Sequence, residues 1–285
     1  MKKAKSGRLE LEIVTAILFL VFLFPFLMVL MNSAKTAFEV TQYPLSLPEN
    51  WGNIGKNIVT IWGSDNIHYA SSLFSSFFIT AFSLVFLNLL SAQAAWVLVR
   101  TKTKLSNVIF FVFVAAMVIP FQIVMFPLLT WLRTITNLTG LRLLRTYLGM
   151  IVCYIGFGIS LSIFMFHGFI KSVPLELEEA ATIDGCTRFQ IFYKIIFPLL
   201  TPIQATVAVL NGIWIWNDYL LPLLILGKGN AVQTLPLAVS NFAGAFVKQW
   251  DLIMTAVLLA MIPIIICFFI AQKYIVKGML AGSIK

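Results

Sequence analysis

Residues 172–185 read Ser-Val-Pro-Leu-Glu-Leu-Glu-Glu-Ala-Ala-Thr-Ile-Asp-Gly, a polar stretch between two apolar runs of membrane length. We expect a short helix here, with Ser172 as its N-cap, Pro174 in its first turn, acids in its N-terminal half and Gly185 at its end. At about 1.5 Å per residue, such a helix is too short and too charged to span lipid. It is therefore expected to lie at a membrane surface.

A second helix is expected directly after this corner. Thr187 and Gln190 have the spacing of a capping box, in which each side chain bonds the other residue's backbone N–H. This helix leads into Pro198 and the next apolar run. Ala180 and Ala181 would give the first helix a shallow face that another protein could approach closely.

The composition places most of the chain in lipid. Hydrophobic residues make up 60% of it and charged residues 11%, where a soluble domain has roughly a quarter charged, and the mean hydropathy is +0.95. The net charge of +9 comes from basic residues at the ends of apolar runs, a pattern typical of membrane topology rather than nucleic-acid binding. The three cysteines are not placed together, so neither a disulfide framework nor a metal site is expected.

Six apolar runs are long enough to cross a bilayer core of about 30 Å. The first follows four basic residues, as a signal peptide would, but it is too long and lacks a small-residue cleavage site, so we expect an anchor. The predicted fold is an all-α membrane protein with six transmembrane helices. Their limits are Ile13–Met31, Leu73–Val99, Val108–Leu132, Tyr147–Ile170, Leu199–Leu226 and Leu252–Ala271.

The basic residues predict cytoplasmic N- and C-termini, because this orientation puts thirteen Lys and Arg residues inside and seven outside. Residues 133–146 argue the other way, since they carry three arginines and no acid yet fall outside. The predicted organisation is a cytoplasmic N-terminus (1–12), a transmembrane domain (13–271) with a cytoplasmic loop (172–198), and a cytoplasmic tail (272–285) without an amphipathic stripe.

Two outer segments, Thr36–Ser72 and Gly227–Asp251, are long enough to contact a partner. Their tryptophans Trp51, Trp62 and Trp250 are interpreted either as anchors at the level of the lipid headgroups or as part of a docking surface for a soluble protein.

No catalytic constellation can be assembled from the sequence. His68 and His167 are expected on opposite sides of the membrane, and no cluster has metal-ligand spacing. The stretch Gly227-Lys228-Gly229 lacks the spacing of a nucleotide-binding loop. The chain is therefore expected to be no enzyme, to hold no cofactor or metal, and not to hydrolyse ATP alone.

Polar residues within the apolar runs leave alternatives open. Asp218, the only acid among them, is expected near the outer interface, either hydrogen-bonded together with Asn217 or lining an outer mouth. Asn211, Gln93 and Gln122 either line a translocation path or hold helices together. Residues expected to kink or interrupt the third and fifth runs are Pro120, Pro127, Pro202, Gly212 and Pro222.

The polar loop resembles the EAA loop of the inner-membrane permease subunits of binding-protein-dependent ABC importers. The pattern is met by Glu179, Ala180, Ala181, Gly185, Ile195 and Pro198, with Phe197 where Leu is usual. Four further stretches look like the carbohydrate branch, specifically the smaller maltose-type permease. They are 183–185, 214–218, 234–237 and the tail 272–282, where Met279 and Leu280 depart from the usual Leu-Thr. The resemblance runs from Phe24 to Lys285.

The resemblance implies a multi-pass subunit of the bacterial or archaeal cytoplasmic membrane that moves a sugar or oligosaccharide by alternating access. Its implied partners are a second homologous permease, two ABC ATPase subunits that hydrolyse the ATP, and an extracytoplasmic solute-binding protein. The residues implied in ATPase coupling are Glu179, Ala180, Ala181, Asp184, Gly185 and Pro198. Lys277, Gly278 and Gly282 are implied in tail contacts, and Asn211, Asn217 and Asp218 in the path.

The alternative from another class is an ion-coupled secondary transporter. Such a protein needs titratable coupling groups at mid-membrane and inverted repeats. The sequence shows neither, apart from the peripheral Asp218.

Overall fold

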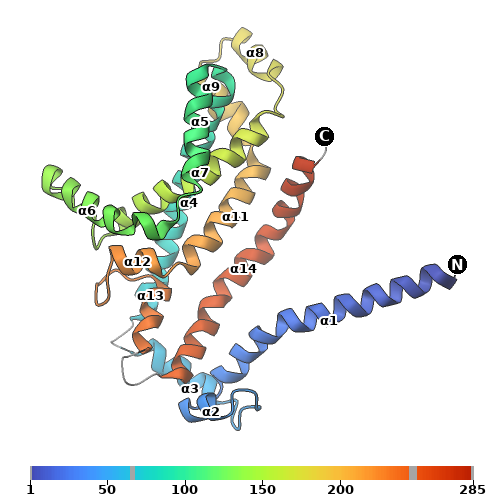
Figure 1. Ribbon diagram of the computed structural model, residues 1–285, viewed down its shortest axis with the longest axis vertical. Coiled ribbons are helices and arrows are strands. Elements are labelled where there is room, and N and C mark those ends of the chain that lie inside the picture. The colour runs from blue at the N-terminus through green and yellow to red at the C-terminus, as the bar shows by residue number, and fades with distance from the viewer. Residues whose placement is uncertain (1, 65–67, 244–248, 284–285) are drawn as a thin grey trace. The chain divides into compact units, whose positions relative to one another are not determined.

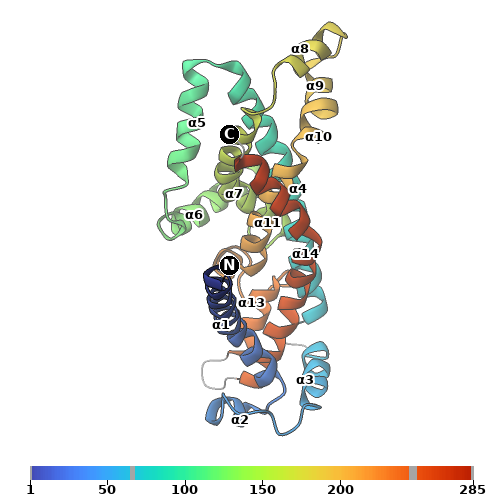
Figure 2. The ribbon, with the colours of Figure 1, turned by 90° about the vertical axis from the view of Figure 1, so that its right-hand side faces the viewer.

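The computed structural model describes residues 2–64, 68–243 and 249–283, which form helices joined by turns and loops (Figures 1 and 2). The chain divides into two compact units. Unit 1 comprises residues 1–70 and 238–263, and unit 2 comprises residues 71–237 and 264–285.

Unit 1 contains the first helix and two short helices that come after it. Its elements are α1 (Lys2–Ser33), α2 (Ala37–Gln42), α3 (Asn53–Trp62), the 3₁₀ helix η2 (Ser240–Phe242) and the first part of α14 (Trp250–Ser283). Thr255 Oγ1 donates to the Ser33 carbonyl (3.0 Å), which joins α14 to the end of α1.

The buried side chain of Lys35 stabilises the turn after α1 in unit 1. Its side chain is fully buried, and Nζ donates to Asn32 Oδ1 (3.1 Å) and to the carbonyls of Tyr43 (2.8 Å) and Pro44 (3.1 Å). Burial lowers the pKa of the Lys35 ammonium, and the nearby charge of Glu39 opposes that shift. This lysine, one of the seven basic residues expected on the outer side, therefore stabilises the fold.

Unit 2 contains the remaining helices. They are α4 (Tyr69–Thr101), α5 (Lys104–Ala116), α6 (Phe121–Thr139), α7 (Tyr147–Ile170), α8 (Glu176–Ile183), α9 (Arg188–Ile191), the π-helix η1 (Phe192–Ile196), α10 (Phe197–Leu199), α11 (Thr201–Asn217), α12 (Leu220–Ile225) and α13 (Leu235–Val239). The first residues of α4 and the last of α13 belong to unit 1.

The all-α membrane fold is confirmed, with four helices long and apolar enough to cross a bilayer, or up to six if two bent pairs each form one span. The four are Glu10–Ser33, Tyr69–Thr101, Tyr147–Ile170 and Trp250–Phe269.

The third and fifth predicted spans are not single continuous helices, as their expected kink residues indicated. The third is broken between α5 and α6, which meet at 106°, with Pro120 at the N-cap of α6. The fifth breaks at Leu200, where the axes differ by 72° and Pro202 lies in the first turn of α11, and again between α11 and α12. Proline lacks the backbone N–H that a continuous helix needs, and the breaks before α6 and at Leu200 lie beside the expected kink residues Pro120 and Pro202. Pro127, Gly212 and Pro222 lie inside helices.

The middle of unit 2 is packed closely around a glycine of α7. A Cβ on Gly158 would lie 2.8 Å from Asn211 Oδ1 of α11 and 3.0 Å from Leu87 Cδ1 of α4. Only a residue without a side chain lets these three helices approach so closely.

The last helix continues beyond its predicted end at Ala271, since α14 extends to Ser283. Long straight-chain residues such as Gln272 and Lys273 are good helix formers, so the chain has no reason to leave the helix there. The tail residues Lys277, Gly278 and Gly282 lie in this helix.

Thiol labelling tests the predicted orientation. Lys56 and Lys228 are exposed, so cysteines placed there should react with an impermeant reagent in intact cells, whereas one at Gln190 should react only after permeabilisation. The background for this experiment replaces Cys186 and Cys267, the two cysteines that are not buried, by serine. Labelling of Gln190→Cys in intact cells would overturn the assignment.

Candidate functional site

Helix α8 begins later than predicted. It starts at Glu176, after Leu175, which makes no side-chain cap. The proposed N-cap, Ser172, is wrong because its hydroxyl donates backwards to the Phe169 carbonyl (2.7 Å). Pro174 also disfavours helical backbone at the residue before it, so α8 forms only after the proline.

Gly185 ends α8, as predicted. Gly185 has φ +81°, its N–H donates to the Thr182 carbonyl (3.1 Å), and the Cys186 N–H donates to the Ala181 carbonyl (3.0 Å). This pair of bonds is a Schellman motif, which ends a helix with a left-handed residue. Asp184 is the C-cap of α8 and is exposed.

The predicted capping box at the start of α9 is confirmed. The Thr187 N–H donates to Gln190 Oε1 (2.8 Å), and the Gln190 N–H donates to Thr187 Oγ1 (3.3 Å). The chain then passes through η1 and α10, where Pro198 is exposed.

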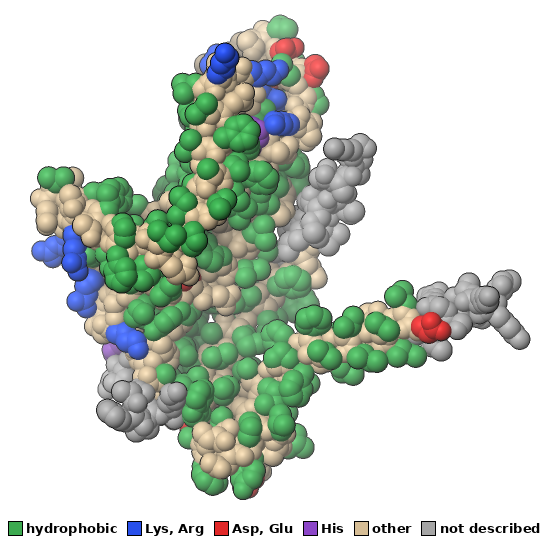
Figure 3. All heavy atoms as spheres, in the orientation of Figure 1, with side chains coloured by type: hydrophobic (Ala, Val, Ile, Leu, Met, Phe, Trp, Pro, Cys, Tyr) green, Lys and Arg blue, Asp and Glu red, His purple; other side chains and the backbone are tan. Residues whose placement is uncertain are grey.

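The exposed face of this loop differs from the one predicted. Ala181 is buried in the core (5% exposed), while Ala180 and Glu179 are exposed. The most exposed large apolar side chains of the loop are Ile183, 87% exposed, and Phe189, 70% exposed. Lys, Arg, Asp and Glu side chains gather at this end of unit 2 (Figure 3). The exposed surface of the loop therefore consists of apolar side chains surrounded by charged ones.

Glu178, next to the exposed Glu179, faces inward. Its Oε1 accepts from Arg100 Nε (2.8 Å) and its Oε2 from Trp96 Nε1 (3.0 Å). Arg100 Nη2 also donates to the Val173 carbonyl (3.0 Å). The sequence does not reveal this pair, because Glu178 is one of three acids in the first turn of α8 and Arg100 is one of several basic residues at the ends of apolar runs.

A second contact joins α4 to the chain after the corner. Gln93 Nε2 donates to the hydroxyl of Tyr193 in η1. Gln93, Trp96 and Arg100 are three and four residues apart, so they lie on one face of α4. Of the two alternatives for Gln93, the structure shows that it joins helices.

The polar residues expected on a path are placed as follows. Asn211 is buried, and its Nδ2 donates to Ser162 Oγ of α7 (3.1 Å). Asp218 Oδ2 accepts from the Tyr154 hydroxyl (3.2 Å), and Asn217 donates to the Ile213 carbonyl (2.8 Å) rather than to Asp218. Asn211 thus joins α11 to α7. Gln122 is exposed on α6. The part of these residues in a translocation path stays a prediction.

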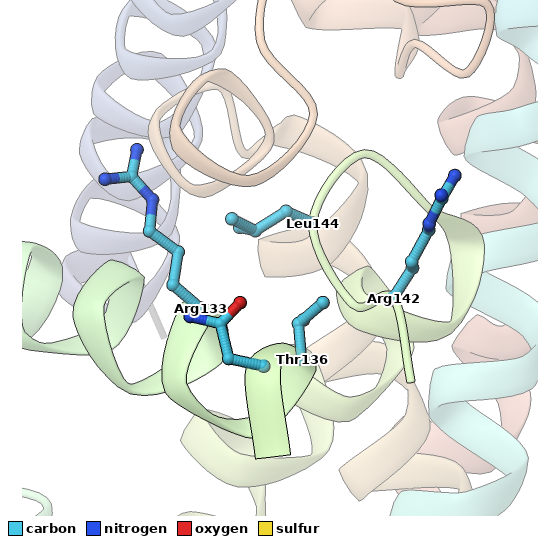
Figure 4. Close-up of a pocket in the computed structure, with 5 residues that line it drawn as sticks. Arg133, Thr136, Arg142 and Leu144 are labelled. Carbon is cyan, nitrogen blue, oxygen red and sulfur yellow. The ribbon is translucent and has the colours of Figure 1, made fainter. Parts of the chain in front are cut away.

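A cavity of about 280 Å³ lies beside the end of α6. Arg133 and Arg142 lie on opposite sides of it, with Thr136 and Leu144 between them (Figure 4). Within the described part of the chain, neither arginine forms an ion pair. None of the residues predicted for the path lines this cavity. Among the described residues, no group of three or more His, Cys, Asp or Glu could hold a metal ion.

Comparison with known proteins shows the family to which this chain belongs. Residues 88–281 match the family described as the inner membrane component of binding-protein-dependent transport systems. The chain belongs to this family. It is a permease subunit, not an enzyme, and a multi-pass protein of the inner membrane.

Three similar permeases illustrate the match. AmyC of Thermoanaerobacterium thermosulfurigenes, described as a permease of a transport system for starch degradation products, is 38% identical over the whole of both chains. MsmG of Streptococcus mutans, from a multiple sugar-binding transport system, is 35% identical over 73% of each chain. MelC of Bacillus subtilis, an import permease for melibiose, raffinose and stachyose, is 34% identical over 75% of this chain and 76% of its own.

A solved structure has the same fold. The crystal structure of a bacterial ABC transporter that imports the acidic polysaccharide alginate contains a chain with TM-score 0.75 and 21% identity, covering 96% of this permease and 98% of that chain.

Proposed function

We propose that this permease carries a sugar or oligosaccharide inward as one half of the membrane channel of an ATP-driven importer. The three relatives named above are described as permeases for sugars or for starch breakdown products, which supports a carbohydrate substrate. The other half of the channel is a second homologous permease, two ATPase subunits bind on the cytoplasmic side, and a sugar-loaded binding protein docks outside.

The observation that carries the proposal is the two-sided construction of α8. Its inner side is fixed to α4 through Glu178, while its outer side exposes Glu179, Ala180 and Ile183. A contact can couple ATP hydrolysis to transport only if its free energy differs between the two states of the transporter. A helix that is exposed to a partner and fixed to the bundle meets the structural requirement for such a contact.

The remaining assignments complete the proposal. Gly185 and Asp184 set the corner after α8, and Pro198 sets the entry to α11. The end of α14, with Lys277, Gly278 and Gly282, adds a second ATPase contact. Asn211, Asn217 and Asp218 lie along the translocation path, where the two permeases open alternately to each side.

The variant Glu179→Lys tests the proposal. It reverses an exposed charge on α8, and it also places a cation in the first helical turn, where the helix dipole favours acids. We expect about three- to tenfold less ATPase co-purifying with the permease pair and a matching fall in sugar uptake. The measurement is the subunit ratio after purification, alongside uptake of radiolabelled maltotriose and raffinose by cells.

The matched control is Lys104→Glu, which reverses an exposed charge at the start of α5, outside the loop. It should keep both the parental ratio and the parental uptake. If Glu179→Lys also keeps them, the loop does not bind the ATPase and the proposal fails.

A further inference from the structure

We infer that α4 transmits movement of the loop around α8 to the outer segment at Leu235, with Arg100 and Gln93 as positioning residues at one end and Ser76 at the other. This inference rests on the proposed function, because it concerns where the motion of the coupling loop goes. It is carried by the contacts at the two ends of α4, by the packing between them and by the stiffness of the helix.

The cytoplasmic end of α4 is attached to the loop on both sides of its corner. Before the corner, Arg100 binds the Glu178 carboxylate (2.8 Å) and the Val173 carbonyl (3.0 Å). After the corner, Gln93 donates to Tyr193. Arg100 and Glu178 are both largely buried, where an ion pair is little screened by salt and is costly to break. The loop therefore moves together with this end of α4.

The other end of α4 is attached to the outer part of unit 2. Buried Ser76 Oγ accepts from the backbone N–H of Leu235 at the start of α13 (2.7 Å). Ser75 Oγ lies 2.8 Å from the Tyr147 hydroxyl at the start of α7. A backbone donor can be satisfied by few other groups in a buried site, so the Ser76 bond ties α4 to the chain that comes after residue 227.

Between these two ends, α4 is held by packing alone in the described structure. Leu87 packs on Gly158 of α7, and Leu84 on Gly212 of α11. The buried hydroxyls of Ser83 and Ser91 have no hydrogen-bond partner. The glycines let α7 and α11 approach the middle of α4 closely, and such close packing passes a displacement along the helix rather than absorbing it.

The helix is also stiff enough to transmit a displacement. The 33 residues Tyr69–Thr101 contain no proline and no glycine, which are the usual causes of a kink. Ser76 and Arg100 are 24 residues apart, or about 36 Å along the axis, on the scale of the bilayer thickness. The chain is one uninterrupted α-helix over this whole length. A push on α8 is therefore expected to reach Leu235.

The test measures ATPase activity of the complete transporter in nanodiscs, with and without sugar-loaded binding protein. Arg100→Gln and Ser76→Ala should each lower the stimulation by the binding protein at least fivefold, while the complex keeps its ATPase subunits. Ser76→Ala acts far from the loop, so its effect cannot arise from lost ATPase docking. Arg100→Lys, which keeps the charge, should recover at least half of the stimulation.

Two matched controls separate transmission from general damage. Ser83→Ala removes a buried hydroxyl of the same helix that has no partner, and Lys104→Gln removes a nearby exposed charge. Both should behave as the parental complex. Parental stimulation in Ser76→Ala overturns the inference. Loss of the ATPase subunits in Arg100→Gln also overturns it, because the pair then serves docking, and this outcome leaves the proposed function standing.

Discussion

Gly149→Ala should strongly destabilise the folded permease. Gly149 lies in the first turn of α7, and a Cβ built on it would lie 1.8 Å from the carbonyl oxygen of Leu143 and 2.7 Å from the carbonyl carbon. Both atoms are backbone, so no change of rotamer relieves the overlap. Overpacking of this kind costs about 3 kcal/mol or more. The expected result is loss of the monodisperse species in size-exclusion chromatography and a lower midpoint of thermal unfolding.

The overlap would also distort the loop before α7. The Gly149 N–H donates to Thr146 Oγ1 (3.2 Å), and the Arg145 N–H donates to the Ile225 carbonyl (2.9 Å). A shift of the chain at Leu143 would strain both bonds. The control is Gly156→Ala in the same helix, where a Cβ meets nothing within 4 Å. Because alanine favours a helix over glycine by about 1 kcal/mol, this control should be at least as stable as the parent. Equal behaviour of the two variants would contradict the close approach at Gly149.

Gly185→Val should separate the permease pair from its ATPase. The φ of +81° places this residue in the left-handed region, where a β-branched side chain is strongly disfavoured. The surrounding space is open, since a Cβ would meet nothing within 4 Å, so the penalty arises from the backbone alone. We expect a cost of about 1–2 kcal/mol, which corresponds to a roughly 5- to 30-fold change in an equilibrium constant.

The backbone strain at residue 185 destabilises α8, which is a short helix. Helix α8 has eight residues, too few to be stable without its caps and its anchor. Co-purification of the ATPase and sugar uptake should therefore both fall about tenfold, while the permease pair stays assembled. Gly185→Asn is the matched control, because asparagine tolerates the left-handed conformation, and it should keep more than half of both readouts. Identical results for valine and asparagine would show that the backbone conformation of this corner does not matter for docking.

Composition and spacing predicted much of this permease because both have a direct physical cause. Long apolar runs must be helices in lipid, and the capping box and Gly185 satisfy backbone groups that any helix end leaves unpaired. The breaks inside two runs were harder to place. Prolines marked where bending could occur, but whether a proline bends a helix by 106° or sits inside it, as Pro127 does, depends on the neighbouring helices.

The sequence alone could not predict that Glu178 is buried and Glu179 exposed, for a similar reason. The two residues are adjacent, identical and in the same turn, and only the position of α4 decides which one is buried. Ala181 was misplaced for the same cause, because the phase of an eight-residue helix relative to its surroundings is set by contacts made about 80 residues earlier in the chain. Arg100 and Trp96 supply those contacts.

The π-helix η1 gives the number of residues between Gly185 and Pro198 a geometric meaning. The Phe197 N–H donates to the Phe192 carbonyl, five residues back, so this turn holds one residue more than an α-helical turn. Each residue of a helix rotates the next residue by about 100° around the axis and advances it by about 1.5 Å. Deletion of a single residue here would therefore change the direction of α11 relative to α8. Exchange of one apolar side chain for another, such as Phe197 for leucine, leaves that direction unchanged. The number of residues in the loop therefore sets the direction of α11 relative to α8.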